Sequence, residues 1–363
     1  MKTLQRYIIR EFAESFLFGL LIFSIILLLD QIFQLIDLII SKGVPVLTAG
    51  KLFLLIMPNI MSLTIPMAVL LAILLSYGRL SEDNEITAMR SSGLGYLSFT
   101  APILIIVAVL SVLMIYFNQN LTPSTNRQFR QMYKDVLAQR PLVKFEDNSI
   151  TSIGEYKIYV KEVDKRTDRL LGVNIYRFSA EDTDAPWRIT ASSAIVSAGA
   201  QSVVFCLYRG FWQKPNPSKP ENLVHLNFIK YIFSIPMGGQ ILPISQSLHE
   251  LTGKELLNEI SAYRSKKLPT NFLETQYWLR WALAFAPLVM ALVGIPLGIV
   301  LERGGKSIGF GVSLALIFAY YILLVIGLNF GEKGLLRPGV ILWLPDAALL
   351  GTGVWLWKRM LGK

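Results

Sequence analysis

Long runs without a charged side chain constrain this sequence more than any other feature. An α-helix needs about 20 predominantly apolar residues to cross the roughly 30 Å hydrocarbon core of a bilayer. Five runs of about that length contain at most one charge, and a sixth near the start is extended by a helical pattern: residues 52–78, 97–117, 281–301, 308–331, 339–357, and 16–29 continued by 30–40. The sequence therefore predicts six transmembrane helices.

The composition agrees with a membrane protein. Hydrophobic residues make up 53% of the 363 residues and charged residues only 17%, whereas soluble domains carry about 25% charged residues. This balance excludes a disordered chain and an ordinary soluble enzyme. The first run is not expected to be a cleaved signal peptide, because no small-residue cleavage site follows it and Asp30 and Asp37 continue its helical pattern.

A polar insert separates the third predicted helix from the fourth. We place it at residues 118–276, between helices 1–3 (1–117) and helices 4–6 (277–363). Short segments rich in β-branched and aromatic residues indicate strands, at 158–163, 172–178, 188–196, 203–210 and 223–234. Two uncharged runs within it, 189–208 and 231–249, are read as strands and loop rather than as spans, because serines or prolines and glycines interrupt them. An antiparallel sandwich or jelly roll is expected, followed by a return helix at 251–267.

Basic residues near the helix ends predict the orientation, because they accumulate on the cytoplasmic side. One side carries ten of them: Lys2, Arg6, Arg10, Arg79, Arg90, Arg303, Lys306, Lys358, Arg359 and Lys363. The short loops opposite carry Lys42, Lys51, Lys333 and Arg337. Both termini are then cytoplasmic and the β domain is periplasmic. The excess of basic residues on the cytoplasmic side becomes smaller if the residues that flank the fourth helix on the outer side are counted as well: Arg264, Lys266, Lys267 and Arg280.

Few residues suggest chemistry. Gly304-Gly305-Lys306-Ser307 resembles the end of a phosphate-binding loop, but Val300 stands where that loop needs a glycine. The two histidines, His225 and His249, lack partners at metal-ligand spacing, and the single Cys206 excludes a disulfide within the chain. We therefore expect no metal, no cofactor and no catalytic group. Nucleic acid is not expected either, since the basic residues are dispersed and no soluble cytoplasmic domain exists.

Two sets of charges near the membrane each leave two interpretations open. Asp30, Asp37 and Asp346 could mark a proton path, but each is predicted near the outer end of its helix, which favours hydrated interfacial residues. The outer border carries a cluster of basic residues: Lys42, Lys51, Arg264, Lys266, Lys267, Arg280, Lys333 and Arg337. They either anchor the helices by snorkelling or bind an anionic lipid head group.

The loop between the second and third predicted spans is the most informative segment. A helix is predicted at about residues 82–92, with Ser81 as its cap, Glu82, Asp83 and Glu85 at its positive N-terminus, and Gly93 at its end. Ile86 and Met89 form an apolar edge, while Ala88, Ser91 and Ser92 allow close approach of a partner. This helix either lies passively at the interface or docks into a cytoplasmic motor.

The same loop carries a family resemblance. Residues 65–72 (IPMAVLLA) and 78–93 (GRLSEDNEITAMRSSG), together with residues 6–11 (RYIIRE), resemble the LptF/LptG permease family, the membrane subunits of the lipopolysaccharide exporter of Gram-negative bacteria. Further similar segments are residues 158–161, 189–191 and 274–298. The resemblance covers essentially the whole chain, and the opening and the approach to the fourth span are more similar to the LptF type.

The resemblance implies a role and a set of partners. A paralogous permease would complete a heterodimer, a separate cytoplasmic ABC ATPase dimer would hydrolyse ATP, and a periplasmic jelly-roll bridge protein would receive lipopolysaccharide from the β domain. The chain itself would be a non-enzymatic permease of the inner membrane. Spans at about 12–40 and 308–331 would form lateral gates.

The resemblance also assigns residue roles. Glu85, with Glu82, Asp83 and Arg90 beside it, would couple the permease to the ATPase. The placement of charges at the predicted outer border, and not the resemblance, singles out Lys42, Arg264, Lys266, Lys267 and Arg280 as the residues expected to contact the lipid head group. The alternative function is a membrane receptor or mechanotransmitter with a periplasmic sensor domain, which the short cytoplasmic loops make less favourable.

Overall fold

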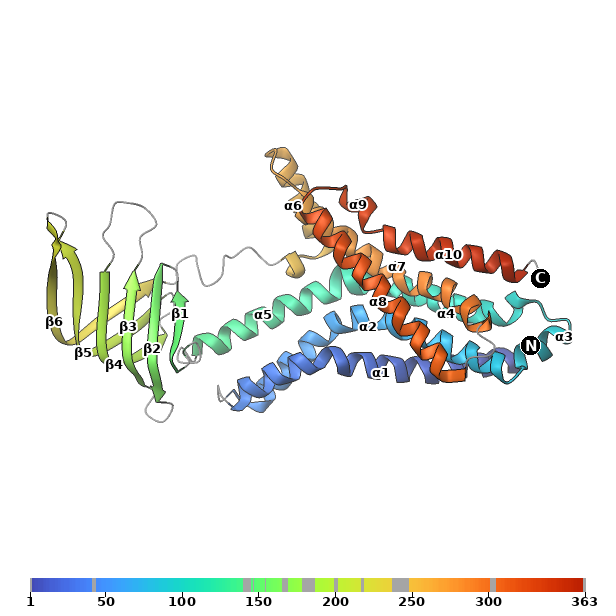
Figure 1. Cartoon of the computed structure of the whole chain (residues 1–363), viewed down its shortest axis with the longest axis horizontal. Coiled ribbons are helices and arrows are strands. Elements are labelled where there is room, and N and C mark those ends of the chain that lie inside the picture. Colours follow the sequence, from blue (N-terminus) through green and yellow to red (C-terminus); the bar gives the residue numbers. More distant parts are fainter. Residues whose placement is uncertain are drawn as a thin grey trace. The chain divides into compact units, whose positions relative to one another are not determined.

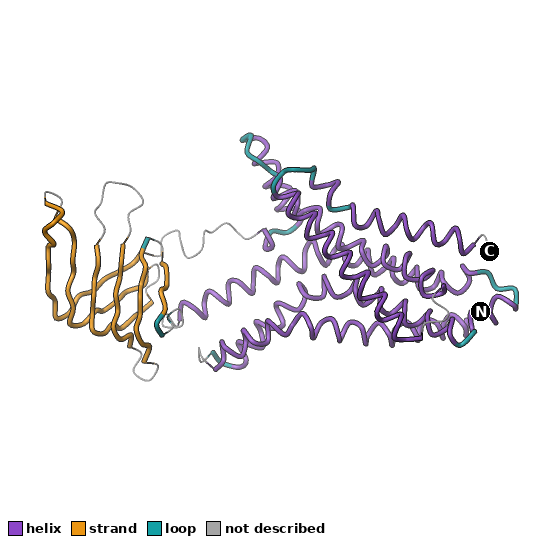
Figure 2. The backbone as a smooth tube through the Cα atoms, in the orientation of Figure 1, coloured by secondary structure: helices purple, strands orange, loops and turns teal. Residues whose placement is uncertain are grey.

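A computed structural model describes residues 2–40, 44–139, 145, 147–153, 155–164, 169–177, 187–198, 202–216, 219–236, 248–300 and 305–361. The chain divides into a helical unit, residues 1–37, 47–129 and 248–363, and a β unit, residues 38–46 and 130–247 (Figure 1). Helices and strands are thus segregated along the chain, with the strands in its middle (Figure 2).

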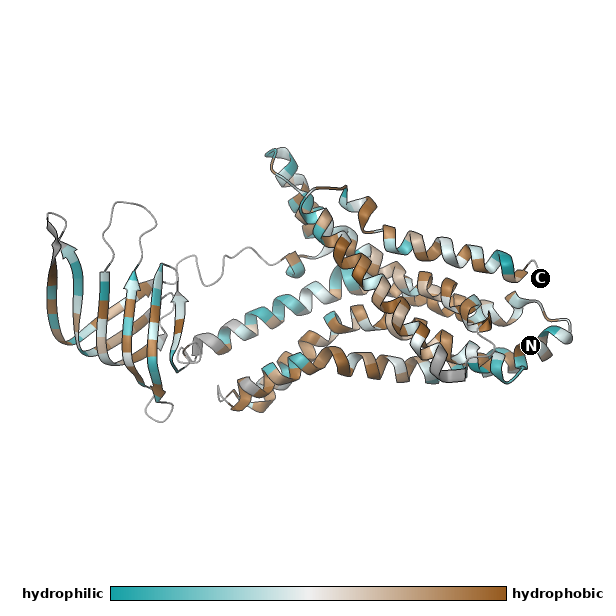
Figure 3. Cartoon of the chain, viewed as in Figure 1, coloured by the Kyte–Doolittle hydropathy of each residue, from teal (hydrophilic) through white to brown (hydrophobic). Residues whose placement is uncertain are grey.

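Among the described residues, six helical segments are long and apolar enough to span a membrane, in agreement with the predicted number. The helices are α1 (Lys2–Ile40), α2 (Val46–Glu82), α3 (Glu85–Ser91), α4 (Tyr96–Tyr116), α5 (Thr122–Gln139), α6 (Gly253–Ser265), α7 (Asn271–Val300), α8 (Gly305–Glu332), α9 (Pro338–Ile341) and α10 (Leu344–Leu361). Their apolar residues form long continuous stretches (Figure 3). Both marked chain ends and α3 lie at the same end of the helical unit (Figure 1).

The centre of the helical unit is formed by α2 and α7, whose apolar stretches are mostly buried, whereas fewer than a third of the residues in the apolar stretches of α1, α8 and α9–α10 are buried. Small residues bring the two central helices together. A Cβ atom on Gly294 would lie 3.0 Å from Ile73 Cγ2, and one on Gly298 would lie 3.0 Å from Tyr77 Cβ. These glycines allow close packing of two helices, which is the usual means of association inside a membrane.

The third span extends beyond the end predicted for it at residue 117. A π-helical turn, η1 (Phe117–Leu121), connects α4 to α5, which continues to Gln139. The predicted insert begins at Asn118, so no helix is predicted there. Asn118 is instead buried: its Oδ1 accepts a hydrogen bond from Ser62 Oγ at 2.8 Å, and its Nδ2 donates to the Arg280 carbonyl at 3.3 Å. Tertiary contacts therefore stabilise the continuation.

The insert contains one antiparallel sheet of six strands, which confirms its all-β character. The strands are β1 (Ser149–Ile153), β2 (Tyr156–Asp164), β3 (Arg169–Arg177), β4 (Trp187–Ala198), β5 (Ser202–Asn216) and β6 (Lys219–Pro236), and they pair in sequence order. This open meander is not a closed barrel, and its connections are simpler than the Greek keys of a jelly roll. Residues 189–198 and 202–208 lie in β4 and β5, in agreement with the predicted strands, and residues 199–201 lie outside the described residues. β1 was not predicted.

The sheet bends at a row of residues on neighbouring strands that are left out of the regular strand pairing. The regular pairing between β2, β3, β4 and β5 skips Lys161, Gly172, Ser192 and Arg209, and both Gly172 and Arg209 have positive φ, at 62° and 48°. The set of buried side chains on β4 changes at Ser192. Before it the odd-numbered Ile189 and Ala191 are buried, and after it the even-numbered Ala194 and Val196 are buried. Residues from both sides of the irregular positions belong to one apolar cluster. The single sheet is therefore bent, and its two halves pack against each other.

Candidate functional site

The predicted loop helix exists as α3, but it is shorter than expected. It begins at Glu85 rather than near residue 82, because Glu82 ends α2 and Asn84 makes a left-handed turn with φ 60°. Ser81 does not cap it, which corrects the prediction; this hydroxyl lies within α2 and donates to the Ile299 carbonyl on α7 at 2.9 Å. Gly93 ends the helix as predicted, with φ 87° and a bond from the Leu94 amide to the Met89 carbonyl.

The two faces of α3 have different surroundings. Ile86 and Met89 are buried in a cluster that includes Ile8 of α1 and Tyr77 of α2. Along the other face, Thr87, Ala88, Ser91 and Ser92 are exposed. The predicted apolar edge is therefore the side that holds α3 on the bundle, and small side chains form the surface that it presents outward.

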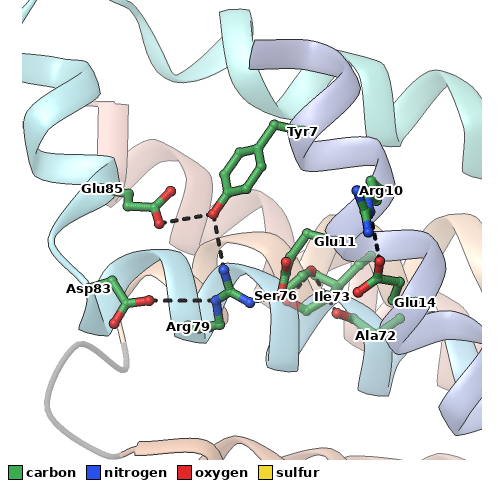
Figure 4. A network of polar contacts seen from close by, with 10 residues as sticks. All are labelled: Tyr7, Arg10, Glu11, Glu14, Ala72, Ile73, Ser76, Arg79, Asp83 and Glu85. Atoms are coloured by element: carbon green, nitrogen blue, oxygen red, sulfur yellow. Dashed lines mark hydrogen bonds and ion pairs between the residues drawn. The ribbon is translucent and has the colours of Figure 1, made fainter. Parts of the chain in front are cut away.

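A polar network joins α3 to α1 and α2 (Figure 4). The Tyr7 hydroxyl on α1 donates to Glu85 Oε1 at 2.9 Å, and Arg79 Nη2 on α2 donates to the Tyr7 oxygen at 3.1 Å. Arg79 Nη1 lies 2.8 Å from Glu11 Oε1, and Arg79 Nε lies 3.5 Å from Asp83 Oδ2. Two of the predicted acidic residues, Asp83 and Glu85, thus meet at one arginine–tyrosine pair.

The contact between Tyr7 and Arg79 is not predictable from the sequence. Tyr7 was noticed only as part of the family-like opening, and Arg79 only as a cytoplasmic charge. No local spacing signals their contact, since they lie 72 residues apart. The remaining predicted residues of this group lie outside the network: Glu82 is exposed at the end of α2, and the Arg90 guanidinium lies 4.3 Å from the centre of the Tyr96 ring.

The basic residues predicted to meet lipid do not form one group. Lys266 and Lys267 are exposed just after α6, and Arg264 Nη2 pairs with Glu274 Oε1 at 2.8 Å. Lys42 lies outside the described residues. Arg280 is buried on α7, where Nη1 donates to the Leu251 carbonyl at 2.7 Å and Nη2 to the Leu248 carbonyl at 2.9 Å. Its guanidinium thus holds the segment that leads into α6.

The acidic residues of the spans also differ from one another. Asp30 is exposed and accepts a hydrogen bond from Gln34 at 2.8 Å. Asp346 was expected to be a hydrated interfacial residue, but it is only 2% exposed in the first turn of α10, which corrects that expectation. The side chain of Asp37 lies outside what the structure describes.

Within the described ranges, no group of three or more His, Cys, Asp or Glu side chains is placed to hold a metal ion. His225 on β6 contacts Gln213 on the neighbouring strand, and Cys206 is a half-buried free thiol on β5. Gly305, Lys306 and Ser307 begin a helix that is itself a candidate span, while Gly304 is outside the described residues.

Six apolar helices among the described residues and a β insert between the third and fourth are the architecture of a multi-pass membrane protein. The sequence matches the family described as lipopolysaccharide export system permease LptF/LptG over residues 6–359, so the chain belongs to that family. Its broad role is lipopolysaccharide export in the inner membrane. The match covers both types, so the similarity to LptF remains a prediction. No individual curated protein matches the chain significantly.

Proposed function

We propose that this chain is one permease subunit of an ABC transporter that extracts lipopolysaccharide from the inner membrane and passes it to a periplasmic bridge protein. Both termini and α3 are cytoplasmic in this proposal, and the β unit is periplasmic. A paralogous permease completes the membrane dimer, and a separate ATPase dimer binds beneath it. Family membership supports the export role; the assignments that follow rest on the geometry.

The observation that carries the coupling role is the two-sided character of α3. Its buried side, Ile86 and Met89, is fixed to the bundle, and its exposed side offers Thr87, Ala88 and Ser91. Small side chains let a partner approach the helix backbone closely, as they do between membrane helices. A helix held firmly on one side and accessible on the other is suited to transmit force from a motor.

The exposed apolar surface of the peripheral helices supports a second permease subunit. On α1, Leu17, Leu21 and Phe33 are more than half exposed, and on α8 Phe318 and Ile322 are as well. Large exposed apolar surfaces mark contact with lipid or with another protein. We assign these two helices to the dimer interface and to the path along which lipid enters.

Recognition of the lipid phosphates is assigned to the cationic group after α6. Lys266 and Lys267 are exposed there, beside the Arg264–Glu274 ion pair. Each basic side chain near an anionic surface contributes about 1 kcal/mol, so the contribution of any single lysine is modest. Lys42 is predicted to belong to the same group. Arg280 is better explained by its two carbonyl contacts.

The coupling role is tested by replacing Glu85 with alanine in the chain co-expressed with its partner permease and ATPase. We expect normal membrane insertion but weaker co-purification of the ATPase, or lower stimulated ATP hydrolysis, because α3 loses its carboxylate.

Glu14→Ala is the matched control. Glu14 is also a carboxylate near the same end of the bundle, but it is exposed and pairs only locally with Arg10, four residues away. Normal lipopolysaccharide transport by the Glu85→Ala complex would exclude the coupling assignment.

A further inference from the structure

The contacts of Glu85 lead from α3 into α1 through a single hydroxyl group. The Tyr7 oxygen donates its proton to Glu85 and accepts a hydrogen bond from Arg79, so it connects three helices at one atom. Arg79 also pairs with Glu11, one turn further along α1. α1 is therefore held at two successive turns by polar contacts to the same loop region (Figure 4).

The hydrogen bonds of Tyr7 and Arg79 depend on the angle between donor and acceptor, whereas the apolar packing around them does not. Ile8 and Phe12 of α1 are buried against Ile86 and Met89 of α3 and their neighbours, but apolar contacts tolerate sliding because they have no preferred angle. A hydrogen bond to a carboxylate is shorter and stronger than a neutral one and requires alignment. The Tyr7–Glu85 bond therefore fixes the position of α1 relative to α3.

Most of α1 beyond its first turns lies at the periphery of the helical unit. Only about a fifth of its apolar stretch is buried in the helical unit, compared with nearly three quarters of that of α2. Beyond its first turns, α1 still contacts α2. A Cβ atom on Gly19 would be 3.2 Å from Leu71 Cδ2, Phe23 is buried in the same cluster as Leu71, and Ser24 Oγ donates to Thr64 Oγ1 at 3.4 Å. A largely peripheral helix whose first turns are moved can pivot about these middle contacts without separating α2 from α7.

We propose that Tyr7 is a positioning residue that transmits movement of α3 to α1, so that ATP hydrolysis is coupled to lipid movement through this hydroxyl. The inference rests on the proposed function, since it assumes a motor on α3. The role of Tyr7 differs from motor binding. Glu85 and its neighbours on α3 contact the motor, and Tyr7 transmits the resulting movement of α3 to the first span. Arg79 orients the Tyr7 hydroxyl by donating to its oxygen.

The experiment uses the complete complex in vesicles that contain lipopolysaccharide, and it measures ATP hydrolysed and lipopolysaccharide transferred in the same sample. Tyr7→Phe removes only the hydroxyl. Tyr96→Phe is the matched control, because its hydroxyl also contacts an α3 residue, Arg90, but belongs to α4. We expect Tyr7→Phe to keep ATP hydrolysis within about twofold while the lipid moved per ATP falls at least threefold. Tyr96→Phe should keep the wild-type ratio.

An unchanged ratio of lipid to ATP in Tyr7→Phe would overturn the proposal, whether both rates stay normal or fall together as a merely structural role predicts. If Tyr7→Phe does not assemble, Arg79→Lys asks the same question from α2: it keeps a positive charge near Glu11 but loses the aligned donor to Tyr7. A lowered ratio there supports the proposal, and a normal ratio rejects it. Absence of transport by the wild-type complex would instead reject the proposed function, and this inference with it.

Discussion

Arg280 lies near a predicted membrane border, where a positive side chain ordinarily meets water or a lipid phosphate. In the structure its guanidinium is buried and donates to the carbonyls of Leu251 and Leu248. The fixed fork of an arginine suits two acceptors at once. The sequence predicts a positive charge near the membrane border. It does not predict that the guanidinium donates to these two carbonyls, because they belong to a segment some thirty residues away in the chain.

Replacing Arg280 with methionine tests this structural role. The change keeps an extended apolar stem but removes two charge-assisted hydrogen bonds, and it leaves two carbonyls without that donor. We expect a loss of about 2 kcal/mol in local stability, seen as faster proteolysis around residues 248–270 in detergent.

Arg264→Met is the comparison for that experiment. Arg264 forms an exposed ion pair with Glu274, and exposed pairs contribute only about 0–1 kcal/mol. Equal proteolysis rates in the two variants would contradict the role given to Arg280.

At the scale of elements, the spans and most strands could be predicted because each depends on local pattern. Uncharged runs defined α2, α4, α7 and α8, and β-branched segments defined β2 to β6. What was missed depends on distant contacts. The extension into α5 is held by the hydrogen bond between Asn118 and Ser62, and Ser81, expected to cap α3, bonds to Ile299 instead. No residue near Asn118 or Ser81 in the sequence signals either partner.

The bend in the sheet depends on a glycine at its closest point of approach. Gly210 lies beside the bend, and a Cβ atom there would be 2.0 Å from the Thr190 carbonyl oxygen and 2.9 Å from Ala191 Cα. Because both are backbone atoms, the strands must separate to accept alanine. We expect Gly210→Ala to destabilise the β unit by about 2–4 kcal/mol, within the range for overpacked sites, and to lower its melting transition in the full-length chain.

Gly50→Ala provides the control for crowding, since nothing lies within 4 Å of a Cβ atom on Gly50. A Gly210→Ala chain that melts like the wild type would show that the bend tolerates a side chain.

For the molecule as a whole, the distribution of basic residues predicts which side of the membrane each unit faces. The prediction is checked in a Cys206→Ser background with one new cysteine at a time, at exposed Asn227 on β6 or exposed Ser91 on α3. A thiol reagent that cannot cross the inner membrane should label Asn227→Cys in cells with a permeabilised outer membrane, and Ser91→Cys only after lysis. The reverse pattern would invert the proposed orientation.

In the proposed function, this chain moves lipopolysaccharide at the expense of ATP hydrolysed by a partner. The most direct measurement reconstitutes the chain with its partner permease and ATPase in vesicles of phospholipid and lipopolysaccharide, and follows transfer of each lipid to the purified bridge protein. We predict transfer of lipopolysaccharide that requires ATP, is lost in Glu85→Ala, and leaves phospholipid behind. Transfer that proceeds equally without ATP, or that moves phospholipid in place of lipopolysaccharide, would contradict the account.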